Sequence, residues 1–557
     1  MKTSNKSIVQ HIVKQCKSQG IRHIVFSPGS RNAPFAIAFD NDPFFKTHII
    51  HDERVAGFYA LGIAQVLNEA VAVCCTSGSA VVNYFPAITE AFYRKIPLLV
   101  ISADRPKNLI NKGHGQTIMQ DEIFGKHVKT FESFEDLSIL QNTSIENCNS
   151  KMESLYQEPK GPVHFNIHLE EPLYETSIVD NGFIPEKNNI LGNHSESIRE
   201  LIKIINGKKT IVLCGQNSGT SELNNELVQF NKNTNVLVLN ENTSGLCDTG
   251  YVNCIDRTLN AVPNEQNEAF IPEILITIGD AIVSKKIKAF FIQNPPEHHV
   301  SINHSNIGID LFHCLGTHLK TNPIDFFSQI NNSDPVRNTV NFEAKWKAID
   351  LKAKDRIPQF FSTENSATDI QAFYLLNEYL NNDTVLHLAN SSVVRYMQLF
   401  DPIKSVAYFA NRGTSGIDGS MSTAVGSAIA LPHKQHVFIS GDVSFIYDSN
   451  AMWVRPFPKN LKIIIINNYG GSIFRIIDGA KTSEQLENYF EAHHQADVRE
   501  IAKGFGFSTV EIEKLKDYEN AVSQFLNSDK HQILIFKTDR IENPLALNRL
   551  FKHLNND

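Results

Sequence analysis

Short apolar runs alternate with longer segments of helical periodicity through most of the chain. Near the N-terminus, Ile8, Ile12, Val13 and Cys16 recur at helical spacing, which predicts a helix that ends at Gly20. Apolar runs of strand length follow, and each precedes a helical segment. The predicted strands of this first section are 24–26, 48–50, 71–76, 98–103 and 163–167. Such regular alternation predicts a doubly wound parallel sheet.

The same rhythm occurs in two later sections of the chain. The predicted strands are 210–215, 236–239 and 274–279 in the middle section, and 385–389, 406–410, 436–440, 461–466 and 532–536 in the last. Polar stretches with Pro, Gly and Asn at 170–193, and between 331 and about 369, predict linkers. We therefore expect an α/β protein with three doubly wound parallel-sheet domains, at 1–180, 195–335 and 365–557.

Composition and charge exclude several classes of protein. A length of 557 residues suggests about three or four domains. The formal net charge of -8 argues against a nucleic-acid-binding surface as the main role. The N-terminus lacks the apolar core of a signal peptide, and no stretch approaches the roughly 18 apolar residues of a membrane span. The eight cysteines show no Cys-x-x-Cys spacing, which favours reduced thiols and a cytoplasmic location over zinc ligation.

The ends of the predicted strands 436–440 and 461–466 carry a group of hard oxygen donors. Asp442 and Asn468 follow the two strands, and a crossover helix, expected at about 449–454, would bring both strand tips to one edge of the sheet. A carboxylate, an amide oxygen and the Gly470 carbonyl suit Mg²⁺, which keeps its other positions for phosphate oxygens. The alternative is a turn aspartate that caps a helix and an asparagine pair that ends a strand.

Other polar groups also stand where ligands bind in α/β folds. The loop 27–32 follows a strand and offers Ser30 and Arg31 to a carboxylate or phosphate; the alternative is a helix-entry turn with a solvated arginine. Glu53 begins a helix, where a carboxylate is electrostatically favoured, and a catalytic role would require burial beside a ring nitrogen. Lys285 and Lys286 begin another helix, either as a solvated pair or as ligand contacts.

The last section contains two further loops of interest. Residues 390–392 can cap the helix that follows, and Arg395 lies one turn after Ser391 on the same helical face. Three glycines within 411–419 indicate a loop whose backbone approaches a ligand closely. Small residues at 424–430, and likewise at 77–91, predict tightly packed helices.

Together these motifs resemble thiamine-diphosphate enzymes of the pyruvate-decarboxylase and acetolactate-synthase type. Their diphosphate-and-metal motif usually begins Gly-Asp-Gly and closes with Asn-Asn, and Val443 stands at its third position here. Within that group the chain is most similar to the 2-succinyl-5-enolpyruvyl-6-hydroxy-3-cyclohexene-1-carboxylate (SEPHCHC) synthases of menaquinone biosynthesis. The segments that carry this resemblance are 27–31, 51–54, 103–106, 390–395 and, above all, 411–419.

The resemblance implies a pyrimidine-binding domain at 1–180, a middle domain at 195–335 and a diphosphate-binding domain at 365–557. It implies thiamine diphosphate with Mg²⁺ or Mn²⁺, held between the first domain of one subunit and the third domain of another. A homodimer or a dimer of dimers would then carry its active sites at the subunit interface. The implied reaction is decarboxylation of 2-oxoglutarate and 1,4-addition of the succinyl carbanion to isochorismate, giving SEPHCHC and CO₂.

The resemblance also implies roles for single residues. Glu53 would act as the catalytic acid on the aminopyrimidine ring, and Ile417 would hold the cofactor in a bent shape. The other cofactor contacts would be Ser391, Gly441, Asp442, Val443, Ser444 and Asn468, with Asp442, Asn468 and Gly470 on the metal. The substrate contacts would be Ser30, Arg31, Arg105, Gln116, Lys285, Asn390, Ser391, Arg395 and Arg412, with Ile473 and Phe474 as an apolar wall. Lys286 stands where the family usually has arginine.

Two other functions are compatible with parts of this pattern. Another thiamine-diphosphate decarboxylase or carboligase, such as one acting on pyruvate, would need small or apolar residues where Arg395 and Arg412 stand. A regulatory or scaffold protein that has lost turnover would lack Glu53 or Asp442, and both are present. No motif implies a flavin.

Overall fold

The computed structural model describes residues 2–135, 142–178, 205–216, 219–263, 268–305, 308–333, 341–528 and 530–555. These residues form three parallel sheets and a two-stranded antiparallel sheet. The chain divides into two compact units, which are described separately. Unit 1 comprises Met1–Ile190, Asn411–Gln435 and Tyr447–Leu461, and unit 2 comprises Leu191–Ala410, His436–Ile446 and Lys462–Asp557.

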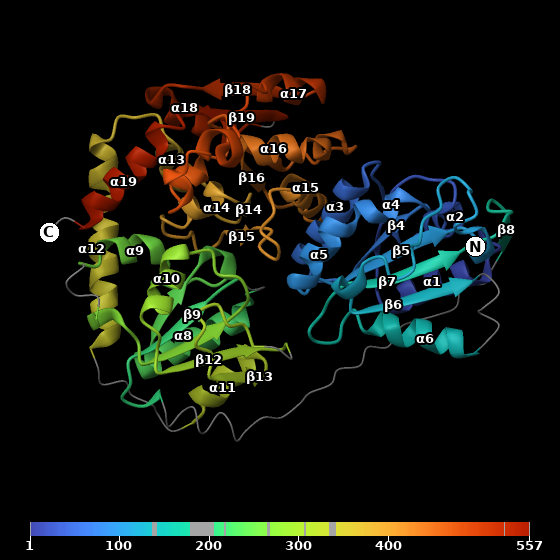
Figure 1. The fold of residues 1–557 in the computed structure, drawn as a ribbon, viewed down its shortest axis with the longest axis horizontal. Helices are drawn as coiled ribbons and strands as arrows, with labels where there is room; N and C mark the ends of the chain where they lie inside the picture. Colours follow the sequence, from blue (N-terminus) through green and yellow to red (C-terminus); the bar gives the residue numbers. More distant parts are fainter. Residues whose placement is uncertain are drawn as a thin grey trace. The chain divides into compact units, whose positions relative to one another are not determined.

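Unit 1 contains a six-stranded sheet with the strand order β3-β2-β4-β5-β7-β6. Its strands are β2 (His23–Phe26), β3 (Lys46–Ile49), β4 (Val71–Cys75), β5 (Leu98–Asp104), β6 (Thr130–Glu135) and β7 (Val163–His168). One face is covered by α1 (Ser7–Ser18), α2 (Ala33–Asp40) and α6 (Asn142–Glu153), the other by α3 (Glu53–Leu67), α4 (Ser79–Asn83) and α5 (Phe85–Tyr93) (Figure 1). The predicted doubly wound sheet and the helix that ends before Gly20 are confirmed.

Three details of unit 1 differ from the predictions. The half-exposed edge strand β6 was not predicted. Within the predicted linker 170–193, β8 (Thr176–Ile178) pairs with β1 (Lys2–Ser4), and the part from 179 lies outside the described residues. The predicted helix at 77–91 is two helices, because Pro86 has no N–H to donate and therefore occurs in the first turn of a new helix, α5.

Unit 1 also contains α15 (Ser420–Ala430), whose backbone packs directly against α3. A Cβ added at Gly426 would lie 2.0 Å from the Tyr59 carbonyl oxygen, and one at Gly62 would lie 2.1 Å from that of Thr423. The hydroxyl of Ser427 donates to the Gly62 carbonyl at 2.9 Å. The small residues of the predicted helix at 424–430 therefore allow two helix backbones to touch.

Unit 2 contains the other two large sheets. The first has the order β10-β9-β11-β12-β13, made of β9 (Thr210–Cys214), β10 (Leu237–Asn240), β11 (Ile274–Ile278), β12 (His298–Asn303) and β13 (Thr317–Lys320). One face packs against α8 (Ser221–Thr234) and α11 (Pro323–Asn331), the other against α9 (Ile255–Ala261) and α10 (Lys285–Gln293) (Figure 1). The predicted strands here correspond to β9, β10 and β11, and Lys285 begins a helix as predicted.

The second sheet of unit 2 has the order β15-β14-β16-β17-β19-β18. Its strands are β14 (Val385–Leu388), β15 (Ala407–Phe409), β16 (His436–Gly441), β17 (Leu461–Asn467), β18 (Ser508–Ile512) and β19 (Gln532–Lys537). The core around it includes α13 (Asp369–Tyr379), α14 (Ser392–Met397), α18 (Leu515–Leu526) and α19 (Glu542–Asn555). The strands β16 and β17 are neighbours, as the predicted meeting of their ends requires.

Two predictions for this part of the chain were wrong. The helix expected at about 449–454 is instead α16 (Asp442–Tyr447), which begins at the end of β16, and Ser449–Trp453 is a 3₁₀ turn. The predicted second linker contains α12 (Phe342–Thr363), which buries Phe342, Trp346 and Ile357, while its residues 334–340 lie outside the described range. The many charged residues of α12 cover its exposed face and hide this apolar stripe from a reading of composition.

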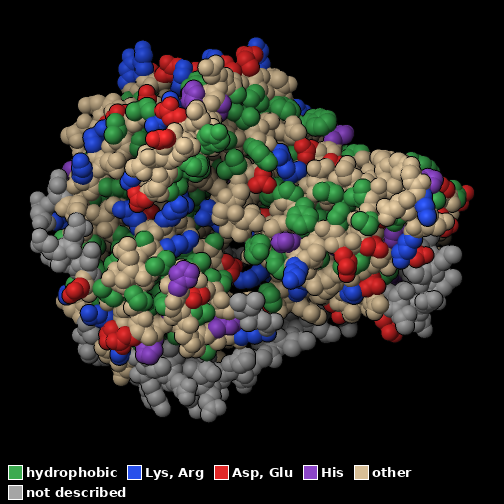
Figure 2. Space-filling model, viewed as in Figure 1, with side chains coloured by type: hydrophobic (Ala, Val, Ile, Leu, Met, Phe, Trp, Pro, Cys, Tyr) green, Lys and Arg blue, Asp and Glu red, His purple; other side chains and the backbone are tan. Residues whose placement is uncertain are grey.

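In the parts of the chain that the structure describes, no helix is long and apolar enough to cross a membrane. On the face shown in Figure 2, basic and acidic side chains are mixed. This mixture agrees with the modest net charge of -8.

Candidate active site

Glu53 stands at the first position of α3, as predicted, and faces a cavity of unit 1. The preceding residue, Asp52, caps the helix by accepting a hydrogen bond from the Val55 N–H at 3.1 Å. The half-buried Glu53 and the exposed Gln116 both line a cavity of about 450 Å³. The remaining lining residues are Pro28, Thr76, Ser77, Gly78, Ser79, Ala80, Thr117 and Ile118. A carboxylate at the mouth of a polar cavity can meet a heterocyclic ligand.

Arg31 and Arg105 also belong to unit 1, and both are tied to neighbouring groups. Arg31 is 6% exposed; its Nη1 donates to the Leu169 carbonyl at 3.0 Å, and its Nη2 lies 3.1 Å from Glu171. Burial lowers the pKa of its guanidinium. Arg105 donates from Nε to the Gly115 carbonyl at 2.9 Å. Arg31 is therefore not the solvated arginine of the alternative interpretation, whereas the adjacent Ser30 is exposed.

The loop 411–419 is anchored by a buried carboxylate that the sequence did not indicate. Glu90 on α5 is 0% exposed and accepts hydrogen bonds from the Gly413 N–H at 2.9 Å and the Thr414 N–H at 2.6 Å. The Thr414 hydroxyl adds a third contact at 2.9 Å. The loop carries the buried Arg412 and the half-buried Ile417. Glu90 thus fixes the backbone of the segment that resembles the family most closely.

The turn after β17 meets Asp442 within unit 2, as predicted from the strand tips. Asp442 is 1% exposed; its Oδ1 accepts from the Val443 N–H at 2.7 Å, and its Oδ2 accepts from the Gly470 N–H at 3.1 Å. Nε2 of His494 lies 3.4 Å from the same Oδ2, and the interaction with the Asp442 carboxylate raises the pKa of His494. His494 was not predicted, since it follows the motif by more than twenty residues with no local signal.

The turn after β17 contains a buried acceptor that has no hydrogen-bond partner. Oδ1 of Asn468 is buried and has no hydrogen-bond partner, while its Nδ2 donates to Asp369 at 3.2 Å and to Ser472 at 3.0 Å. Oδ1 of the neighbouring Asn467 is also buried without a partner. An orphaned amide oxygen beside the Asp442 carboxylate and the Gly470 backbone fits a hard divalent cation such as Mg²⁺ or Mn²⁺.

Two predicted substrate contacts, Lys285 and Arg395, form a cationic pair in unit 2. Arg395 on α14 donates from Nη1 to the Val283 carbonyl at 2.8 Å, close to the start of α10. Burial and then the charge of Arg395 lower the pKa of Lys285. Burial also lowers the pKa of Arg395. The carboxylates of Asp256 and Glu241 raise the pKa of Arg395 against this effect of burial, and a guanidinium beside an ammonium group suits a carboxylate ligand.

Lys286 contacts two residues that are not among the predicted site residues. Its Nζ donates to Oδ1 of Asn260 and lies 4.9 Å from the centre of the Phe551 ring. Burial lowers the pKa of this ammonium group. Lys286 is therefore held by contacts within unit 2.

Two predicted contacts, Asn390 and Ser391, immediately precede α14. Ser391 precedes α14 with φ of 74°, and its side chain makes no capping hydrogen bond, so the predicted cap was wrong. The adjacent Asn390 is 2% exposed.

Ile473 and Phe474 lie in a short 3₁₀ turn, with the Phe474 and Phe490 ring centres 5.9 Å apart. Two aromatic rings therefore lie close together at this turn.

Glu491 holds that turn in place. Its carboxylate is 0% exposed and accepts from Arg475 at 2.8 and 2.6 Å, and Arg540 adds a further ion pair. Its backbone carbonyl accepts from the Gly471 N–H at 2.7 Å. The buried carboxylate therefore links the chain around 491 to the turn that contains Gly470.

The predicted site residues are distributed over both units. Unit 1 holds Ser30, Arg31, Glu53, Arg105, Gln116, Arg412 and Ile417. Unit 2 holds Lys285, Asn390, Ser391, Arg395, Gly441, Asp442, Val443, Ser444, Asn468, Gly470, Ile473 and Phe474. Within each unit the contacts above bring Glu53 to Gln116, Arg395 to Lys285, and Asp442 to the Asn468–Gly470 turn.

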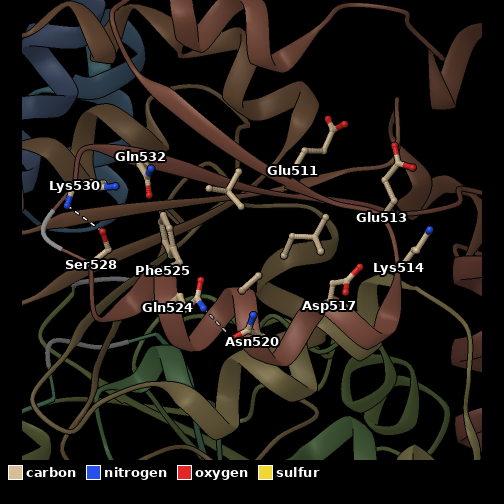
Figure 3. Close-up of a pocket in the computed structure, with 13 residues that line it drawn as sticks. Glu511, Glu513, Lys514, Asp517, Asn520, Gln524, Phe525, Ser528, Lys530 and Gln532 are labelled. Carbon is tan, nitrogen blue, oxygen red and sulfur yellow. Dashed lines mark hydrogen bonds between the residues drawn. The ribbon is translucent and has the colours of Figure 1, made fainter.

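A second hollow, of about 630 Å³, lies between β18 and α18 (Figure 3). Charged side chains of both signs surround it, including Glu511, Glu513, Lys514 and Asp517. Its lining comes from 510–532, so the predicted site residues lie elsewhere in the chain. Volume alone does not identify the active site here.

Comparison with known proteins identifies thiamine pyrophosphate binding domains in the first and last parts of the chain. Residues 6–127 match the thiamine pyrophosphate enzyme N-terminal TPP binding domain, and residues 391–536 match the C-terminal TPP binding domain. A Flavobacterium johnsoniae SEPHCHC synthase is 39% identical, with 98% of this chain and 99% of the relative covered. SEPHCHC synthases of Flavobacterium psychrophilum and Christiangramia forsetii are 39% and 35% identical, over 98% and 100% of this chain and of each relative. The chain therefore belongs to the SEPHCHC synthase family of thiamine pyrophosphate enzymes.

Proposed function

We propose that this protein decarboxylates 2-oxoglutarate and adds the remaining four-carbon unit to isochorismate, giving SEPHCHC and CO₂ in menaquinone biosynthesis. The observation that carries the proposal is the 39% identity, over 98% of the chain, to a relative named for this product. The reaction would take place in the cytoplasm, with Mg²⁺ or Mn²⁺ beside thiamine diphosphate. The three sheets would correspond to pyrimidine-binding, middle and diphosphate-binding domains at 1–180, 195–335 and 365–557.

The proposed proton chemistry depends on Glu53. Bound thiamine diphosphate supplies an acidic C2–H and an electron sink for the loss of CO₂. The Glu53 carboxyl, which faces the cavity from the first turn of α3, would hold a proton against a ring nitrogen of the aminopyrimidine. Ile417 would support the bent shape of the cofactor from the loop that Glu90 anchors.

The donor set of unit 2 would hold the metal and the diphosphate. The Asp442 carboxylate, Oδ1 of Asn468 and the Gly470 carbonyl are oxygen donors of the kind that Mg²⁺ prefers. The diphosphate would accept hydrogen bonds from N–H and hydroxyl groups of Gly441 at the end of β16, of Val443 and Ser444 at the start of α16, and of Ser391. The metal would neutralise the negative charge that the diphosphate brings to Asp442.

Arginine and lysine side chains would select the two substrates by their carboxylates. Both 2-oxoglutarate and isochorismate carry two carboxylates, so several cations are needed. The adjacent Arg395 and Lys285 form one cationic group, and Arg412, Arg31 and Arg105 offer others. Ser30, Gln116 and Asn390 would add hydrogen bonds, and Ile473 and Phe474 would border the ring of isochorismate. Pyruvate, with one carboxylate, would form fewer ion pairs with these cations than either proposed substrate.

The two halves of the site would come from different chains. We propose a homodimer or a dimer of dimers, in which unit 1 of one subunit supplies Glu53 and unit 2 of the other supplies Asp442 and Asn468. A cofactor with a pyrimidine at one end and a diphosphate at the other can bridge two such halves.

The experiment that tests the function is a CO₂-release assay with purified protein, thiamine diphosphate and Mg²⁺. We expect release from 2-oxoglutarate, with SEPHCHC formed only when isochorismate is also present. Release from pyruvate in preference to 2-oxoglutarate would instead favour another decarboxylase of this class. No release from either oxoacid would favour a protein that binds the cofactor without turnover.

A further inference from the structure

We propose that Asp369 is a positioning residue that orients the side-chain amide of Asn468, so that its oxygen is directed at the divalent cation. This inference rests on the proposed function, because it takes Asn468 as a metal ligand. Asp369 lies about one hundred residues before Asn468 in the chain and begins α13. Its part in the site arises from contacts that only the folded chain provides.

Asp369 is a buried carboxylate surrounded by donors. It is 1% exposed, and its Oδ2 accepts from Nδ2 of Asn468 at 3.2 Å. Its Oδ1 accepts from the Thr538 hydroxyl at 2.6 Å and from Nδ2 of Asn543 at 2.8 Å. Since all three partners donate, both oxygens act as acceptors, which is the hydrogen-bonding pattern of an ionised carboxylate. Asp369 is thereby occupied and supplies no oxygen to a metal.

An amide has one donating end and one accepting end, so its partner decides which way it faces. A carboxylate opposite Asn468 selects the NH₂ end, and the Ser472 hydroxyl at 3.0 Å accepts from the same nitrogen. With the amide reversed, Oδ1 would face the Asp369 carboxylate and the two acceptors would repel. Asp369 therefore turns Oδ1 of Asn468 away from itself.

The orientation leaves Oδ1 buried without a partner. An unsatisfied buried acceptor destabilises the folded protein. A divalent cation at the Asp442–Gly470 turn would satisfy this oxygen. Asp369 thus acts through Asn468, in the manner of the outer contacts that orient metal ligands in other proteins.

The test uses the full-length enzyme with saturating thiamine diphosphate, and Mn²⁺ as the probe, whose bound fraction is measured by electron paramagnetic resonance. Asp369→Asn lacks one of the two acceptor oxygens, and we expect its Mn²⁺ dissociation constant to rise about 10–100-fold. The control, Thr538→Val, removes a different donor to Asp369 and leaves the Asn468 contact. We expect this control to lower the melting temperature while its Mn²⁺ affinity stays within about threefold of the wild type.

A reciprocal exchange keeps the test decisive if Asp369→Asn folds poorly. Asp369→Asn combined with Asn468→Asp places the donor and the acceptor on opposite sides, and we expect it to bind Mn²⁺ more tightly than Asn468→Asp alone. Wild-type affinity in Asp369→Asn, or no recovery in the double variant, would overturn the proposal. Asp442→Ala distinguishes failure of this proposal from failure of the metal assignment. If Asp442→Ala also binds Mn²⁺ like the wild type, the metal assignment itself fails.

Discussion

Glu53 and Asp442 are the two carboxylates on which the proposed chemistry depends, and their surroundings differ. Glu53 is half-buried and faces a cavity, where it can exchange a proton with a ligand. Asp442 is 1% exposed and accepts hydrogen bonds from two backbone N–H groups. The first is therefore suited to acid–base work and the second to a cation.

The first prediction concerns Glu53→Gln. The amide keeps the shape of the side chain but cannot transfer a proton, so bound thiamine diphosphate should exchange its C2 proton about 10²–10⁴-fold more slowly. Exchange in D₂O, quenched with acid and read by proton NMR, measures this rate. The control is Glu69→Gln, which changes an exposed carboxylate near the end of the same helix. An unchanged exchange rate in Glu53→Gln would remove Glu53 from the mechanism.

Among single residues, the sequence predicted those that follow strands or begin helices. It missed the distant residues that hold these segments in place. Glu53, Asp442 and Asn468 could be proposed as site residues because each stands at a strand tip or helix start within a local motif. Asp369 and Glu90 could not, because each acts on a segment roughly one hundred to three hundred residues away. Such contacts leave no periodicity or spacing in the chain.

Among the elements, fully buried strands were the most predictable. The strands β4, β5 and β17 are buried along their whole length, so their apolar runs are continuous. The edge strands β6, β13 and β18 are half-exposed and carry polar residues, and no apolar run marks them. Helix α12 was mistaken for a linker because its polar face dominates its composition.

The second prediction concerns the anchor of the loop 411–419. Glu90→Gln presents an NH₂ group where the carboxylate accepted a backbone N–H, so it should lose about 1.5–3 kcal/mol of charge-assisted hydrogen bonding. We expect KM for the carboxylate substrates to rise about 10-fold, with a smaller change in kcat, because Arg412 is positioned less well. Steady-state kinetics measure this split.

Limited proteolysis gives a readout of the same loop that is independent of activity. Arg412 is 8% exposed in the wild type, so trypsin should cleave after it slowly. Cleavage should be faster in Glu90→Gln, and unchanged in Glu69→Gln. If the loop of Glu90→Gln resists trypsin and KM is unaltered, Glu90 does not hold the loop.

The third prediction concerns a histidine within β7. His164 is 0% exposed, and burial lowers its pKa to about 3. An unfolded histidine titrates near 6.5, so the unfolded chain takes up a proton that the folded chain refuses. The stability from this group is complete above about pH 6.5 and is lost as the pH falls toward 3, by about 2 kcal/mol between pH 7 and 5.

His164→Gln keeps a nitrogen near the Ser102 hydroxyl, which lies 2.7 Å from Nε2 in the wild type. We expect its free energy of unfolding to fall by about 2 kcal/mol less than that of the wild type between pH 7 and 5. Urea unfolding at both pH values measures the difference. His114→Gln, which alters an exposed loop residue, should keep the wild-type pH dependence. Equal pH dependence in all three proteins would contradict this assignment.

For the whole molecule, the α/β class and the three large parallel sheets were predicted from the sequence and are confirmed. Alternating strands and helices determine this class because each element buries one face against the next. The assembly could not be derived in the same way, because the apolar and charged surface of one chain does not specify the geometry of its partner. The proposed assembly rests only on the resemblance to the family, and it is therefore the part of the account that most needs measurement.

The fourth prediction addresses the claim that two chains share each active site. Glu53→Gln and Asp442→Ala chains with different tags are co-expressed, and mixed dimers are isolated by two affinity steps. Each parent alone should be inactive. A mixed dimer should recover about half of the wild-type rate of SEPHCHC formation, because one of its two sites combines an intact Glu53 with an intact Asp442. Mixed dimers as inactive as their parents would show that each site lies within one chain, contrary to this account.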